Sequence, residues 1–173
     1  MRKVVYLVAS SLDGKIAKED GGFDCFPMEG EHVTEYLTSL KDFDDVLMGR
    51  NTYEVGTKVG LTNPYPSMRG HVFSQSMEKS PDANVRLVKD DAAEYVRTLK
   101  NQPGRDIYLC GGGALAARLL EEKLIDELAI KLNPLLIGPG IPLFTKVKEP
   151  LLLKLISSKV YDSGVLLLRY QVN

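Results

Sequence analysis

The chain has 173 residues, of which 44% are hydrophobic and 26% are charged, and its formal net charge is −1. This composition is typical of a globular domain, and the length suffices to bury a core without disulfides, so we expect a single domain over residues 1–173. Because 22 basic residues nearly balance 23 acidic ones, no broad basic surface for nucleic acid or an anionic membrane is expected.

The two cysteines, Cys25 and Cys110, form no close pair and no metal-type spacing, so we expect free thiols in a reducing cytoplasm. His32 and His71 have no partners at ligand spacing, which predicts no metal site. No apolar run reaches the length of a membrane span. The short apolar run near the start ends without a cleavage pattern, which favours a buried strand over a signal peptide.

The first part of the chain predicts a strand, a loop and a helix. Residues 4–9 are a continuous apolar run ended by a turn signal, which is typical of a strand buried on both faces. Residues 10–30 are predicted to form a long loop, and loops of this length are usually functional or disordered. Residues 31–40 are predicted to be helical. The buried stripe of this helix is expected to contain Val33, Tyr36, Leu37 and Leu40.

The middle of the chain continues this alternation. A short strand over 46–48 leads into a second short helix, and the glycine- and proline-containing segment 57–68 is predicted to be irregular. Two further strands are predicted over 71–74 and 85–88. Asp44 and Asp45, which precede the first of these strands, are predicted to be solvated charges, whereas Tyr36 and Phe43 are expected in the core.

The last part of the chain predicts another strand–helix unit before an antiparallel hairpin. A helix is predicted over 90–100, because acidic residues in its first turn suit the helix dipole. A strand over 107–110, a glycine turn and a helix to about residue 123 follow, and then a strand over 127–132. Residues 135–144 contain several prolines and glycines and are predicted to be irregular.

Two apolar runs over 151–160 and 165–172 are joined by a turn signal at 161–164, which predicts a β-hairpin. Strands that alternate with helices indicate a mainly parallel sheet with helices on both faces. We therefore expect an α/β fold with three αβα layers, and a mixed sheet whose C-terminal antiparallel hairpin lies at one edge.

Residues 106–119, DIYLCGGGALAARL, place three consecutive glycines between a predicted strand and a predicted helix. Glycines there serve either as a permissive turn or as a close approach for a phosphate at the helix N-terminus. Gly111, Gly113 and Ala116 match the pattern G-x-G-x-x-A. The acids Asp126 and Glu127 begin the next strand, whereas a Rossmann dinucleotide site needs an acid at its end, so that site is disfavoured.

Two more strand exits have a similar character. Residues 47–53 place Gly49 and Arg50 at a helix start, where a glycine admits the backbone and an arginine offers bidentate geometry for phosphate. Residues 72–76 leave a strand with Ser-Gln-Ser. Strand exits of a parallel sheet lie along one edge, where α/β folds bind ligands. Together they predict a site for NADPH, a dinucleotide with a phosphorylated ribose.

The chain also resembles a known fold family over nearly its whole length. MGRNTYE at 48–54, the serines at 74–76 and the glycines at 111–113 resemble dihydrofolate reductases. SLDGKIA at 11–17, LIDEL at 124–128 and the Asn-Pro to Gly-Pro-Gly stretch at 133–140 resemble more closely the reductase domain of riboflavin biosynthesis, which shares that fold.

The resemblance implies that NADPH is the cofactor and that its contacts come from the three strand exits and from the first strand and loop. It also implies a cis peptide between Gly111 and Gly112. The implied cofactor-binding residues are Ala9, Ile16, Gly49, Arg50, Thr52, Ser74, Gln75, Ser76, Gly111, Gly112, Gly113, Ala114 and Leu115.

On the substrate side, the resemblance implies that Asp13 binds sugar hydroxyls and that Lys15 meets a phosphate or assists proton transfer. Dihydrofolate reductases carry a carboxylate on the first helix, and the matching position here falls near Val33. Glu31 and Glu35 lie close to it, and Glu31 is the alternative catalytic acid. The chain has no tryptophan and no deaminase signature of the H-x-E and P-C-x-x-C kind.

The resemblance therefore implies an NADPH-dependent reductase, similar to 5-amino-6-(5-phosphoribosylamino)uracil reductase, that acts on a small molecule. A dihydrofolate or pterin reductase, or a non-catalytic nucleotide-binding module of the same fold, are the alternatives. The apolar C-terminal hairpin is compatible with a homodimer, because an exposed apolar edge strand invites pairing.

Overall fold

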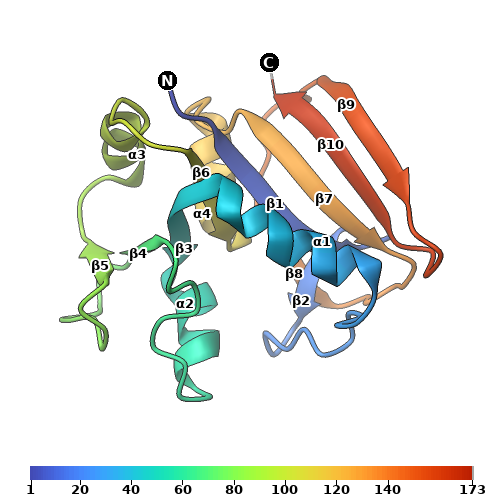
Figure 1. The fold of residues 1–173 in the computed structure, drawn as a ribbon, viewed down its shortest axis with the longest axis horizontal. Helices are drawn as coiled ribbons and strands as arrows, with labels where there is room; N and C mark the ends of the chain where they lie inside the picture. Colours follow the sequence, from blue (N-terminus) through green and yellow to red (C-terminus); the bar gives the residue numbers. More distant parts are fainter. Residues whose placement is uncertain (173) are drawn as a thin grey trace.

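The computed structural model describes residues 1–172 and contains an eight-stranded sheet with the strand order β5-β4-β3-β6-β1-β7-β10-β9 (Figure 1). The strands of this sheet are β1 (Val4–Ser11), β3 (Phe43–Gly49), β4 (Arg69–Phe73), β5 (Val85–Val88), β6 (Asp106–Gly111), β7 (Glu127–Asn133), β9 (Leu153–Val160) and β10 (Leu166–Val172). The helices are α1 (Glu31–Ser39), α2 (Arg50–Thr57), α3 (Ala92–Lys100) and α4 (Gly113–Glu121), with a 3-10 turn, η1 (Leu40–Asp42), after α1.

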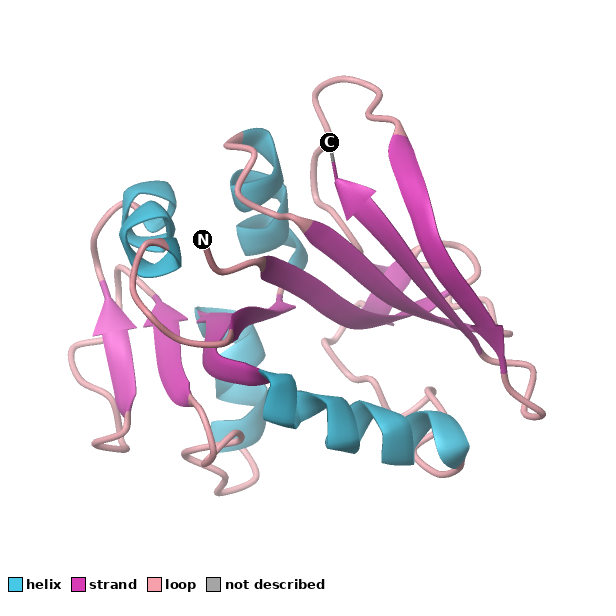
Figure 2. Cartoon of the chain, turned by 45° about the horizontal axis from the view of Figure 1, so that its top comes forward, coloured by secondary structure: helices cyan, strands magenta, loops and turns pink. Residues whose placement is uncertain are grey.

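The sheet is parallel from β5 to β7 and antiparallel beyond it. β1 pairs with β6 on one side and with β7 on the other, both in parallel. β10 then pairs antiparallel with β7, and β9 pairs antiparallel with β10. Residues of α3 and α4 pack in one core and residues of α1 and α2 in the other, and Figure 2 shows helices on both sides of the sheet. The three-layer αβα architecture with a hairpin at one edge is therefore confirmed.

The first strand is buried on both faces because its side chains alternate between two apolar cores. Val4 and Tyr6 pack in the core beneath α3 and α4, whereas Val5 packs in the core that includes Tyr53 of α2. Helix α3 starts where the acidic residues predicted it, because the Asp91 carboxylate accepts hydrogen bonds from the first-turn amides of Ala93 and Glu94.

Two predicted irregular segments each contain a short strand. β2 (Lys15–Lys18) lies within the predicted loop over 10–30, and β8 (Gly140–Pro142) lies within 135–144. They pair antiparallel with each other. Their hydrogen-bonding partners are more than a hundred residues apart in the chain, so neither segment carries a local strand signal.

The first helix differs from its predicted stripe. Leu37 is 59% exposed, whereas His32 is the buried residue of α1. The α-helix was predicted to extend to residue 40, but it ends at Ser39 and continues as a 3-10 turn over Leu40–Asp42. Within residues 1–172, no helix is long and apolar enough to cross a membrane.

Candidate functional site

Two helix N-termini meet at the carboxyl edge of the sheet. Gly49 ends β3 and caps α2, and Gly112 follows β6 and caps α4. A Cβ atom added to Gly49 would lie 3.5 Å from the Gly112 nitrogen, and one added to Gly112 would lie 3.2 Å from Thr52 Oγ1. The first turns of α2 and α4, with their free amides, are therefore neighbours, which is an arrangement suited to anionic groups.

The three consecutive glycines have different structural reasons. Gly111 has a φ of +130°, which side chains rarely adopt, and its peptide bond to Gly112 is cis. A Cβ on Gly113 would lie 2.5 Å from the Pro142 carbonyl oxygen of β8, so this glycine lets α4 pack against the small sheet. The cis peptide implied by the family resemblance is thus present, and part of the glycine requirement is internal packing.

The structure brings Arg50 and Ser76 together. Arg50 Nη1 donates a hydrogen bond of 2.8 Å to Ser76 Oγ across the gap between α2 and the exit of β4, and both residues are exposed. Ser74 is buried, and its hydroxyl accepts from the Met77 amide at 3.1 Å. The Gln75 side chain donates to the Lys89 carbonyl oxygen. Ser74 and Gln75 therefore shape the turn, while Arg50 and Ser76 present polar groups to solvent.

A cleft of about 300 Å³ adjoins this turn. Sequence reasoning missed three charged residues in it: Asp90, Asp91 and Arg118. Arg118 of α4 has its Nη2 3.3 Å from Oδ2 of Asp91, the N-cap residue of α3. This ion pair links the two helices. No sequence pattern indicated Arg118, because its position depends on how α3 and α4 pack. The cleft is lined by Phe73, Ser74, Gln75, Val88, Asp90, Asp91, Ala92 and Arg118.

Asp13 is held by its own loop and by a distant one. Its carboxylate accepts a 2.5 Å hydrogen bond from Ser11 Oγ and bonds from the backbone amides of Ile137 and Gly138. The bond from Ser11, followed by those from the two amides, lowers the pKa of Asp13 to about 2. An ionised carboxylate only accepts hydrogen bonds, so Asp13 is no proton donor near neutral pH.

The other expected contacts lie around the same edge. Lys15 begins β2, and its backbone amide donates to Ser11 Oγ. Ile16 is partly buried on the same strand. Ala9 is partly buried on β1, opposite Lys131 of β7. Ala114 is exposed in the first turn of α4, and the Leu115 Cβ would lie 3.9 Å from a Cβ on Gly49.

The acids of α1 are tied to the C-terminal hairpin. Lys159 Nζ of β9 bonds to both Glu31, at 2.9 Å, and Glu35. Tyr161 donates to the second Glu35 oxygen at 2.6 Å. The bonds from Lys159 and then Tyr161 lower the pKa of Glu35. Both carboxylates thus have partners at the tip of the hairpin.

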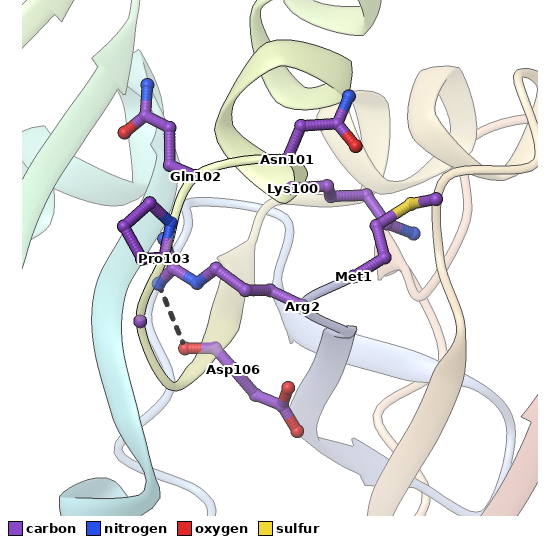
Figure 3. Close-up of a pocket in the computed structure, with 8 residues that line it drawn as sticks. Met1, Arg2, Lys100, Asn101, Gln102, Pro103 and Asp106 are labelled. Carbon is purple, nitrogen blue, oxygen red and sulfur yellow. Dashed lines mark hydrogen bonds between the residues drawn. The ribbon is translucent and has the colours of Figure 1, made fainter.

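A larger pocket of about 690 Å³ lies at the opposite, amino edge of the strands (Figure 3). Arg2 and Lys100 in it are buried, and each has an acidic partner: Asp45 for Arg2 and Asp126 for Lys100. Its cations are therefore neutralised from within the protein. The pocket is lined by Met1, Arg2, Lys100, Asn101, Gln102, Pro103, Gly104 and Asp106.

Asp45 at this edge is not a solvated charge, so that prediction was wrong. It is completely buried and accepts bonds from Arg2, which precedes β1, and from Arg69 and His71 of β4. Asp44 is also paired, with Arg105. Among residues 1–172, no cluster of three or more His, Cys, Asp or Glu side chains is arranged to hold a metal ion.

Comparison with known proteins places this geometry in a family. A model of the RibD C-terminal domain matches residues 2–167. YwjB of Bacillus subtilis, described as an uncharacterized protein, is 35% identical over 165 residues, which are 95% of each chain.

Solved structures of similar fold agree with this family match. A putative riboflavin biosynthesis protein from Shewanella sp. PV-4 superimposes with a TM-score of 0.84 at 30% identity, over 100% of this chain and 99% of the other. A diaminohydroxyphosphoribosylaminopyrimidine deaminase/5-amino-6-(5-phosphoribosylamino)uracil reductase from Thermotoga maritima gives 0.75 at 18% identity, over 99% of this chain and 57% of the other. Dihydrofolate reductase from Enterococcus faecalis, complexed with NADP(H), gives 0.73 at 16% identity, over 99% and 96%. The fold is therefore that of dihydrofolate reductase, and the chain belongs to the RibD C-terminal domain family.

Proposed function

We propose that the chain is an NADPH-dependent reductase that acts on a small molecule of the phosphoribosylamino-pyrimidine class. The observation that carries the proposal is the meeting of two helix N-termini, at Gly49 and Gly112, beside the exposed Arg50–Ser76 pair. A dinucleotide phosphate needs backbone donors and room close to the backbone, and these residues offer both. When bound, NADPH supplies a hydride from its nicotinamide.

The Arg50–Ser76 pair suits the additional phosphate of NADPH. A guanidinium and a hydroxyl that already share a 2.8 Å hydrogen bond offer several donors in one place. The neighbouring cleft carries Asp90, whose carboxylate suits hydroxyl and amino groups of the adenosine end rather than phosphate, whereas Asp91 is engaged by α3 amides and by Arg118. Thr52, whose hydroxyl lies beside Gly112, adds a donor between the two helix starts.

For the substrate, Asp13 and Lys15 keep their proposed roles with one refinement. Asp13 is ionised, so it serves as an acceptor for sugar hydroxyls, and the Lys15 ammonium meets a phosphate. Dihydrofolate or pterin reduction is the weaker candidate. Glu31 and Glu35, the acids nearest the pterin-binding position, both bind Lys159, and Val33 is apolar. Glu31 is therefore not our choice for the catalytic acid.

Turnover measurements separate these functions. Purified protein is mixed with NADPH and either 5-amino-6-(5-phosphoribosylamino)uracil or dihydrofolate, and the loss of nicotinamide absorbance is followed. We expect NADPH oxidation with the uracil and none above background with dihydrofolate. Oxidation with dihydrofolate alone would reverse the assignment. Tight NADPH binding without turnover of either compound would support the non-catalytic nucleotide-binding module.

We also propose a cytoplasmic homodimer that forms through the hairpin edge. The edge strand β9 is exposed along nearly its whole length, and α1 contacts it at Lys159, near its end. Leu155, Ile156 and Val160 on β9 and Leu152 just before it are large exposed apolar residues, which a second copy would cover. Cys25 and Cys110 are free thiols, as a reducing compartment allows. Light scattering tests the dimer, and a monomer at high concentration would refute it.

A further inference from the structure

Three phenols and a thiol form a connected chain beside the glycine turn. The Tyr36 hydroxyl of α1 lies 3.1 Å from the Tyr108 hydroxyl of β6 and 3.3 Å from that of Tyr65, which belongs to the segment between α2 and β4. The Tyr65 hydroxyl lies 3.4 Å from Cys110 Sγ. These four groups come from three separate parts of the chain, and Cys110 has hydrogen bonds with both Tyr65 and Tyr108.

The Cys110 sulfur is an acceptor in this cluster. Burial raises the pKa of the Cys110 thiol, and hydrogen bonds from Tyr65 and Tyr108 oppose this shift. A phenol is a stronger donor than a thiol, so the tyrosine hydroxyls donate to the sulfur, and the Tyr36 hydroxyl links the two phenols. The hydrogen of the Cys110 thiol is therefore left for a group outside the cluster.

The Cys110 thiol lies beside the glycine turn. Cys110 is partly exposed and directly precedes the Gly111–Gly112 peptide at the carboxyl end of β6. Its side chain packs on the α1 and α2 side of the sheet, in the cluster that contains Met48 and Tyr53. Burial raises the pKa of the Cys110 thiol and of the Tyr65 phenol, so both stay protonated near neutral pH.

We propose that the Cys110 S–H donates a hydrogen bond to the oxygen or nitrogen of the hydride acceptor, and that Tyr65, Tyr36 and Tyr108 are positioning residues that orient this donor. The inference rests on the proposed reductase function. A neutral donor at this point selects an acceptor with a carbonyl or imine heteroatom, on which negative charge develops as the hydride arrives. Such a donor does not favour a pterin ring, which dihydrofolate reductases bind with a carboxylate.

A labelling experiment tests the location without any substitution. The protein is treated briefly with N-ethylmaleimide, alone, with NADPH, and with NADPH plus 5-amino-6-(5-phosphoribosylamino)uracil, and each cysteine is quantified by mass spectrometry. Cys25 is exposed and is the internal control. We expect ligands to protect Cys110 at least severalfold and to leave Cys25 unchanged. Labelling of Cys110 that no ligand alters, in protein shown to bind NADPH, would overturn the inference.

Substitutions test the role. In Cys110→Ala we expect kcat with the uracil to fall about 100-fold, the loss that follows removal of one transition-state donor. NADPH affinity should stay unchanged, and Cys110→Ser should restore most of kcat because its hydroxyl also donates. Tyr65→Phe should lower kcat without changing NADPH affinity, and Cys25→Ala is the matched control.

The outcomes separate the two proposals. A wild-type protein that does not bind NADPH refutes the reductase function, and this inference falls with it. A protein that binds NADPH and turns over the uracil, but keeps wild-type kcat in Cys110→Ala, refutes the inference alone. Because Cys110→Ser adds no bulk, it keeps the test valid if the alanine variant melts early.

Discussion

Replacing Asp45 with asparagine perturbs a charge cluster whose central carboxylate is completely buried. The Asp45 side chain has no exposed surface. Its Oδ1 accepts bonds of 2.8 Å from Arg69 Nε and 2.7 Å from His71 Nε2, while Oδ2 accepts from Arg69 Nη2 at 2.7 Å and from Arg2. The single carboxylate of β3 thus binds side chains of β4 and of the segment that precedes β1.

The cost is set by the cations that the variant leaves behind. Arg2 is only 5% exposed, so Asp45→Asn leaves a buried guanidinium without its counter-charge. Breaking a buried ion pair from one side costs about 3–5 kcal/mol. For a domain of this size, each kcal/mol lowers Tm by about 2–4 °C, so we expect a decrease of about 6–20 °C. The adjacent Asp44→Asn is the matched control, because Asp44 pairs with an exposed Arg105 and should cost at most about 1 kcal/mol.

The stability difference between wild type and Asp45→Asn should depend on pH, in a direction that the pKa of Asp45 determines. Burial alone would raise the pKa of Asp45, but the hydrogen bonds from His71, Arg69 and Arg2 outweigh it and hold that pKa well below its usual range. A depressed pKa stabilises the fold fully above the unfolded-state pKa of about 3.9, and this contribution is lost as the pH falls toward the folded-state pKa. The stability gap between wild type and Asp45→Asn should therefore shrink below about pH 4.

Circular dichroism during thermal unfolding, at neutral pH and in acid, measures both quantities. If Asp45→Asn lost no more stability than Asp44→Asn at neutral pH, or if the gap widened in acid, the reasoning would be refuted.

Two further predictions concern the glycine turn and the Asp13 loop. Gly113→Ala should destabilise the protein by about 1–3 kcal/mol, because its Cβ would lie 2.5 Å from the Pro142 carbonyl oxygen. Gly49→Ala, whose Cβ would make only ordinary contacts of 3.5 Å or more, should leave Tm nearly unchanged. If urea unfolding showed the same loss of stability in both variants, this explanation would be contradicted. Asp13→Asn should speed hydrogen exchange at the amides of Ile137 and Gly138, which lose a charged acceptor, and unchanged protection there would contradict the role of this carboxylate.

The framework of the fold could be predicted because its signals are local. Buried strands read as apolar runs, Asp91 marks the start of α3, and turn residues mark the C-terminal hairpin. The same local signals indicated the strand exits at Gly49 and Gly112. That these two exits lie side by side followed from the parallel order of the sheet.

The missed features all depend on partners that are distant in sequence. Asp45 can be buried because Arg2, from the start of the chain, and His71, from the neighbouring strand β4, bind its carboxylate, and two adjacent aspartates give no hint of which one is enclosed. β2 becomes a strand only by pairing with β8. Glu35 of α1 meets Lys159 more than a hundred residues later, so its availability as an acid could not be judged from spacing.

The central claim is tested most directly by titrating the protein with NADPH and with NADH while nicotinamide fluorescence is followed, in the wild type and in Arg50→Ala. Arg97→Ala is the control, since that arginine is equally exposed but lies on α3 and pairs with Glu94 and Glu122. We predict that the wild type binds NADPH more tightly than NADH. A charge-assisted contact contributes about 1.5–3 kcal/mol, so Arg50→Ala should weaken NADPH binding by about 10- to 150-fold and change NADH binding little. Failure of the wild type to bind either nucleotide, or an NADPH preference that survives in Arg50→Ala, would contradict the account.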